Sequence, residues 1–151
     1  MKNKQLLIFA VSLAMSLSAV RALAHAGHDR EGLPIGLHRG NVEIIKGIET
    51  ADGMEIYAEA TVSDGTLKVY LLTLKKGASE FTAFSTKTEL KNIELKVEYP
   101  RAKKTEKLSA TVKDDSIEAS LTPKEPNRFL VHLSTTYRSK KGMAKIQFEA
   151  Q

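Results

Sequence analysis

Regular alternation of apolar and polar residues is the feature of this chain that most limits its fold. Every second residue from 54 to 62 is apolar, and the pattern returns from residue 67 to 71. The two runs flank Asp64-Gly65, a pair that tolerates the positive φ angles of a two-residue type I′ turn. Because side chains alternate between the two faces of a strand, this segment predicts a β-hairpin with one buried and one solvated face.

The period of two continues toward the end of the chain. Further alternating runs begin near residues 93, 108, 117, 129 and 144, and Asp114-Asp115 and Ser139-Lys140-Lys141-Gly142 predict turns between them. After the first 24 residues, no long segment has the i, i+3, i+4, i+7 spacing of an amphipathic helix. About eight or nine short strands predict an all-β fold over residues 41–151, an antiparallel β-sandwich of immunoglobulin-like outline.

The first 24 residues have the pattern of an export signal. Lys2 and Lys4 precede an uncharged, mostly apolar run over residues 6–20, and Ala22-Leu23-Ala24 places small residues at the positions that a signal peptidase reads. The run falls short of the roughly 20 apolar residues that a transmembrane helix needs. We therefore predict a signal helix over residues 1–24, cleaved after Ala24 or after Ala26, and a mature protein that is not inserted in a membrane.

Composition and motifs count against several classes of function. The chain has no Cys, and loss of the three basic residues of the signal lowers its net charge from +5 to +2, so nucleic-acid binding gains no support. Gly-x-Ser-x-Gly, His-Glu-x-x-His and a phosphate-binding glycine loop are absent from the sequence. Glu55, Glu59, Glu94 and Glu98 occupy alternating positions that are typical of solvated strand faces. We therefore predict a protein that is not an enzyme.

A small basic cluster stands apart from the mixed charges elsewhere. Lys103, Lys104 and Lys107 follow Pro100 closely, where an alternating run has just ended. Exposed lysines discourage two sheet edges from pairing with each other. The cluster therefore predicts either a solvated loop or an edge strand.

Residues 25–40 are rich in glycine and histidine and have neither a period of 2 nor one of 3.6, which predicts a flexible arm before the domain. The arm contains His25, His28 and His38, and the fourth histidine, His132, lies in a predicted strand. After cleavage at Ala24, His25 offers both its α-amine and its imidazole. Imidazole and amine nitrogens suit Cu(II), Ni(II) and Zn(II).

A metal site of this kind needs a second imidazole that the fold holds in place. His38 and His132 are the candidates, and His28 lies close enough to His25 in the arm to add a further ligand. In its strand, His132 shares a face with Leu130 and Ser134, opposite the more apolar face of Phe129. The predicted ligands for a transition-metal ion, Cu(II) or Zn(II), are therefore His25, His28 and His38, with His132 as an additional candidate.

The mature N-terminus resembles that of small periplasmic proteins of Gram-negative bacteria. His-Ala-Gly-His-Asp after the signal, then Leu37-His38-Arg39-Gly40 before the first strand, is similar to their His-rich arm and Leu-His-Gly-Gly-like turn. Val69-Tyr70-Leu71 after the first hairpin is similar to a strand in the N-terminal β domain of periplasmic adaptor subunits of heavy-metal efflux pumps. The resemblance covers roughly residues 27–151. It implies a periplasmic β-sandwich associated with metal handling.

The chain is also similar, more distantly, to periplasmic copper-carrier β-barrels with an N-terminal histidine. Those proteins carry a metal-binding histidine in their last hairpin, whereas this chain has Ser139-Lys140-Lys141-Gly142 there.

From the histidine-rich arm and the resemblance to metal-handling proteins, we expect an accessory protein that binds transition-metal ions and is linked to an efflux system. The alternative is a protein-interaction module with incidental histidines, in which an exposed sheet face or edge binds another envelope protein.

Overall fold

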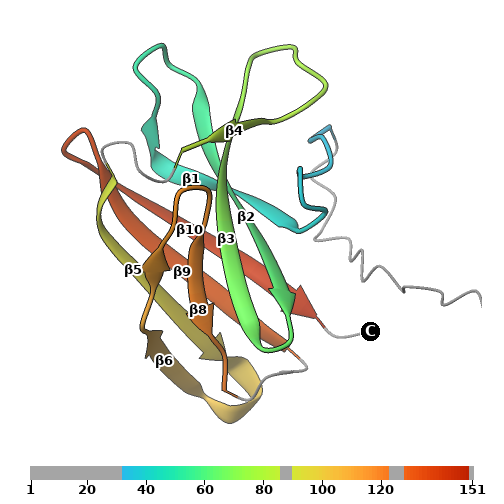
Figure 1. The fold of residues 1–151 in the computed structure, drawn as a ribbon, viewed down its shortest axis with the longest axis vertical. Coiled ribbons are helices and arrows are strands. Elements are labelled where there is room, and N and C mark those ends of the chain that lie inside the picture. Colours follow the sequence, from blue (N-terminus) through green and yellow to red (C-terminus); the bar gives the residue numbers. More distant parts are fainter. Residues whose placement is uncertain (1–31, 86–89, 123–127, 150–151) are drawn as a thin grey trace, which may run out of the picture.

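The structure, a computed structural model, describes residues 32–85, 90–122 and 128–149. The predicted signal sequence lies outside these residues, as do His25 and His28. The described segments form ten strands and one short 3₁₀ turn (Figure 1). The strands are β1 (Asn41–Glu49), β2 (Glu55–Ser63), β3 (Thr66–Leu74), β4 (Thr82–Phe84), β5 (Leu90–Tyr99), β6 (Lys104–Leu108), β7 (Thr111–Val112), β8 (Ile117–Ser120), β9 (Arg128–Tyr137) and β10 (Lys140–Glu149), with the 3₁₀ turn η1 (Pro100–Ala102) between β5 and β6.

These strands form one antiparallel sheet that curls into a half-barrel (Figure 1). Neighbouring strands follow the order β6-β5-β9-β10-β1-β2-β3-β8-β7, and β4 also pairs with β3. The predicted all-β class and antiparallel pairing are confirmed. The immunoglobulin-like sandwich is not confirmed: a sandwich has two separate sheets, whereas β1 here pairs with β2 on one side and with β10 on the other.

An irregularity in β1 lies where the two halves of the sheet meet. The register of β1 with β2 shifts between Ile44 and Glu49, and Gly47 within this stretch has a φ of +96°. A Cβ atom at Gly47 would lie 2.5 Å from the carbonyl oxygen of Lys141 on β10. Glycine therefore permits both the left-handed backbone and the close approach of β10. Such a bulge bends a strand and increases its twist, which helps one sheet to enclose a core.

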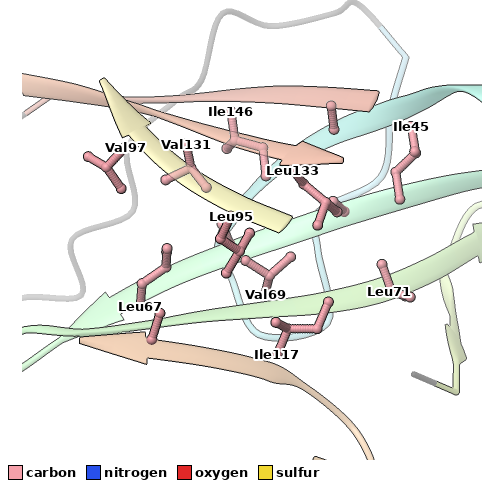
Figure 2. Close-up of a cluster of buried hydrophobic side chains, with 14 of the residues drawn as sticks. Ile45, Leu67, Val69, Leu71, Leu95, Val97, Ile117, Val131, Leu133 and Ile146 are labelled. Carbon is pink, nitrogen blue, oxygen red and sulfur yellow. The ribbon is translucent and has the colours of Figure 1, made fainter. Parts of the chain in front are cut away.

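The inner face of the half-barrel holds the hydrophobic core (Figure 2). Leu67, Val69 and Leu71 of β3, predicted to share one face of their strand, are all fully buried. They pack into one cluster with Leu95 of β5 and Leu133 of β9. Burial of each such side chain contributes about 1.5–3 kcal/mol relative to exposure. The alternation in the sequence thus identified the buried face correctly.

The predicted hairpin at Asp64-Gly65 is confirmed. Ser63 pairs with Thr66, and Asp64 and Gly65 have φ values of 50° and 73°. The last hairpin differs in position from its prediction. Its turn consists of Arg138 and Ser139, which have φ values of 47° and 67°. Lys140, Lys141 and Gly142 already belong to β10 and pair with residues of β9.

The basic cluster lies at one end of the sheet. Lys104 and Lys107 belong to β6, the terminal strand in the sheet order, and Lys103 precedes it. Lys104 forms an ion pair with Glu106, and Lys107 forms one with Glu94 on the neighbouring strand. Of the two alternatives for this cluster, the structure supports the edge strand.

Candidate metal-binding site around His38

The structure places His38 and His132 at two separate sites. His38 lies in the turn before β1 and contacts β2 and β3, whereas His132 lies in the middle of β9. In the sheet order, β1 and β10 separate β2 from β9. His25 and His28 lie outside the described residues. The described part of the chain therefore does not bring its two histidines together as ligands of one ion.

Residues 36–40 form a tight turn against β2. The amide of Arg39 donates a hydrogen bond to the carbonyl of Gly36 over 3.1 Å, and Arg39 has a φ of +56°. A Cβ atom at Gly36 would overlap the carboxylate of Glu59, and one at Gly40 would overlap the carbonyl of Ala60. Both glycines thus permit a close approach to β2. We predicted a flexible arm as far as residue 40, but hydrogen bonds attach this last part of it to the sheet.

Glu59 of β2 is the buried polar group beneath this turn. Its side chain is 0% exposed. Oε1 accepts hydrogen bonds from the amides of His38 (2.8 Å) and Gly40 (2.7 Å), and Oε2 lies 3.0 Å from Nδ1 of His38. A buried carboxylate is costly unless hydrogen bonds and charge compensate for its lost water. The turn supplies that compensation, and the expectation that Glu59 lies on a solvated strand face is wrong.

The contact with Glu59 sets the orientation of the His38 ring. A carboxylate accepts a hydrogen bond from Nδ1–H and thereby favours the tautomer in which Nε2 has a free lone pair. The ring stacks on Tyr70 with centroids 3.5 Å apart and planes 10° apart. Tyr70 of β3 pairs directly with Glu59 of β2, so both contacts of the ring come from one cross-strand pair. The side chain of His38 is nevertheless 40% exposed, which leaves part of the ring open to solvent.

A small apolar cluster covers the sheet beside this site. Tyr57, Leu72 and Phe81 are buried together, and Leu33 packs against them from the segment before the turn. Tyr57 and Glu59 are two residues apart in β2 and therefore share its outer face. Apolar neighbours lower the local polarity and strengthen the hydrogen bonds of Glu59.

His132 also contacts a glutamate, but at an open surface. Its Nε2 lies 2.8 Å from Oε2 of Glu98 on β5, and the two side chains are 35% and 34% exposed. Lys145 of β10 lies 3.8 Å from the same oxygen. These residues line a groove of about 730 Å³ on the side of β5, β9 and β10 that faces away from the core. The prediction that His132 lies on the wetter face of its strand agrees with this position.

The described residues do not by themselves contain a complete set of metal ligands. Among residues 32–85, 90–122 and 128–149, no three His, Cys, Asp or Glu side chains come together as a ligand group. His38 offers one imidazole nitrogen, and Glu59 is the hydrogen-bond partner that such a ligand usually has on its other nitrogen. A metal ion bound to His38 would therefore need further ligands from outside the described residues.

Sequence reasoning missed Glu59 and Tyr70. The available signal was the pair Gly36 and Gly40, which brackets His38 and predicts a close backbone approach. Nothing in the alternation of β2 distinguished Glu59 from the exposed Glu55.

Comparison of the chain with protein-family models, with curated proteins and with solved structures gives no match. The described segments also contain no helix with the length and apolar character that a membrane span requires.

Proposed function

We propose that this protein is an exported, non-enzymatic accessory protein that binds a transition-metal ion, with Nε2 of His38 as the ligand that the fold provides. The observation that carries the proposal is the contact between Nδ1 of His38 and the buried carboxylate of Glu59. Metal-binding histidines almost always donate their other ring N–H to a carboxylate, a carbonyl or a water, which fixes the tautomer and makes the ligand more basic.

The remaining ligands in this proposal are His25 and His28. A chain cleaved after Ala24 begins with His25, whose α-amine and imidazole can chelate one ion together. His28 precedes His38 by ten residues, a separation that an extended chain spans with roughly 35 Å at most, so its reach is sufficient. Nitrogen ligands of this type favour Cu(II), with Zn(II) and Ni(II) as weaker alternatives. The pattern of an export signal and the resemblance to periplasmic metal-handling proteins support delivery of the ion to an efflux system.

The first experiment is a titration of the mature protein with Cu(II), Zn(II) or Ni(II) alone, followed by calorimetry and native mass spectrometry. We expect one ion per chain and a loss of affinity of tenfold or more in His38→Ala, because an imidazole ligand is removed. His132→Ala is the matched control and should bind as the wild type does. Equal affinities of wild type and His38→Ala would refute the proposal.

Glu59→Gln tests the role of the carboxylate without removing its bulk. The amide oxygen of Gln can still accept from His38 and Gly40, but its NH₂ group would then face Nδ1 of His38. Nδ1 would become an acceptor, and Nε2 would carry the proton in place of a lone pair. We expect a 10- to 100-fold loss of metal affinity, as for other partners of ligating histidines. Imidazole ¹⁵N NMR reports the tautomer directly. An unchanged tautomer would contradict the assigned role of Glu59.

A further inference from the structure

The groove around His132 is lined by residues of β1, β5, β6, β9 and β10. The pairing register places Lys107 of β6, Lys96 of β5, His132 of β9 and Lys145 of β10 in one row across the sheet. Glu94 lies on one side of this row in β5, and Glu98 lies on the other. Side chains in one such row share a face of the sheet, here the face directed away from the core.

The acidic groups of β5 in the groove already have partners. Glu94 contacts the ammonium groups of Lys96 and Lys107, at 3.2 and 3.3 Å. These two contacts lower the pKa of the Glu94 carboxyl. Glu98 contacts His132 and, less closely, Lys145. This middle part of the groove is therefore close to internally neutral.

Three lysines toward the β9–β10 turn are different. Lys46, Lys91 and Lys141 form no ion pair within residues 32–85, 90–122 and 128–149. Lys46 and Lys141 line the groove, and Lys91 pairs with Thr136, which in turn pairs with Lys141. Met143 pairs with Lys46 and is 58% exposed. One end of the groove, with Lys91 beside it, thus presents three lysines that have no ion pair among the described residues, together with an exposed apolar side chain.

We propose that this end of the groove, defined by Lys46, Lys91, Lys141 and Met143, binds an extended acidic segment of a partner protein. Carboxylates of the segment would neutralise the lysines, and an apolar side chain would cover Met143. The concave shape favours a narrow chain over a flat anionic membrane. The inference does not rest on the metal site, because the hydrogen bonds of His38 and Glu59 and the stacking of His38 on Tyr70 involve none of these four residues.

The dimensions are compatible with a peptide of this kind. Lys91 and Lys141 lie on strands separated by β9, so their backbones are about 10 Å apart at roughly 4.8 Å per strand spacing. Side chains four residues apart in an extended chain face the same side and are about 13 Å apart, at roughly 3.3 Å per residue, so two such carboxylates can each reach one flexible lysine side chain. A segment of about eight residues spans roughly 26 Å and can cross the strands of the groove.

The test uses a fluorescein-labelled peptide about eight residues long, in which Glu and Leu occupy every second position in turn so that both face the same side, and the mature protein at low ionic strength. Fluorescence anisotropy should show saturable binding that weakens with salt. Lys46→Glu/Lys141→Glu should weaken it about tenfold or more, because two attractive contacts become repulsive. The control Lys76→Glu/Lys103→Glu changes the net charge equally, at two exposed lysines outside the groove, and should retain the affinity. Amide shift changes in an NMR titration should concentrate around Met143.

Three outcomes would overturn the proposal. The first is an equal loss of affinity in the control variant and the groove variant, which would mean that net charge alone attracts the peptide. The second is equal binding of a peptide with Gln in place of Glu, which would mean that the carboxylates are irrelevant. Binding to phosphatidylglycerol vesicles, without binding to the peptide, would identify a membrane surface as the ligand. Metal affinity measured in parallel separates this result from the proposed function, because the groove variant should keep the metal affinity of the wild type.

Discussion

His38 and His132 each contact one glutamate, but their surroundings differ. Glu59 is 0% exposed and accepts two backbone amides as well as His38, whereas Glu98 is 34% exposed and has His132 and Lys145 as its ion-pair partners. At the first site the carboxylate is fixed from several directions and the imidazole keeps an open edge. At the second site both partners remain in contact with water. The same pair of residue types therefore fixes the orientation of an imidazole in one place and contributes to a solvated charge array in the other.

The comparison predicts a large difference in stability between two matched substitutions. Glu59→Ala leaves the amides of His38 and Gly40 without their acceptor and should lower the free energy of unfolding by about 3 kcal/mol. Glu98→Ala removes a partly exposed ion pair and should lower it by about 1 kcal/mol or less. Urea denaturation of both variants measures the difference. Equal losses would mean that burial does not distinguish the two glutamates.

A smaller effect is expected from Gly36→Ala. The added methyl group would overlap the Glu59 carboxylate and also approach Val42 to 2.8 Å, so the turn has to shift. We expect a loss of about 1–3 kcal/mol in unfolding free energy, typical of overpacking. A double-mutant cycle with Glu59→Ala separates the two contacts, since removal of the carboxylate should relieve part of the loss. Strict additivity of the two substitutions would argue against a direct contact between the turn and Glu59.

The smallest effect concerns the charge array of the open groove. Lys96 and Lys107 lower the folded-state pKa of Glu94 below its ordinary 4.5. A lowered pKa stabilises the folded state above the unfolded-state pKa, and this contribution disappears as the pH falls through the folded-state value. Glu94→Gln should therefore be slightly less stable than the wild type at neutral pH and equally stable in acid. Urea denaturation of both proteins at several pH values between neutral and acid measures this difference in unfolding free energy. Added salt should also reduce the difference, because the charged groups are exposed and therefore screened.

The sequence predicted the parts of the fold that depend on local pattern. Alternation around Asp64-Gly65 placed two strands and their turn, because positive φ at two adjacent residues is a local requirement. The turn of the last hairpin was misplaced by two residues, since Ser139-Lys140-Lys141-Gly142 contains several residues with turn preferences and Arg138 was not among those considered. The position of Lys104 and Lys107 on an edge strand was one of two alternatives, and the pairing of β6 decided between them.

The sequence predicted one of the two main residues of the candidate site, His38, but not its partner Glu59. His38 was predicted as a ligand because three histidines closely follow the predicted export signal. Glu59 was assigned to a solvated face because polar residues at alternate positions usually lie there. Its burial depends on Gly36, His38 and Gly40, about twenty residues earlier in the chain, which close over β2. A local sequence pattern does not indicate a contact between residues that lie so far apart in the chain.

The sequence by itself determined that this chain forms strands with one apolar face each, because side-chain alternation is a property of the strand alone. The tertiary structure decided that the strands form one curled sheet, since alternation sets the face of each side chain and not the neighbour of each strand. It also decided which polar residues are buried. Glu59 and Glu98 have the same chemistry and the same kind of position in a strand, and the turn that covers Glu59 makes the difference between them.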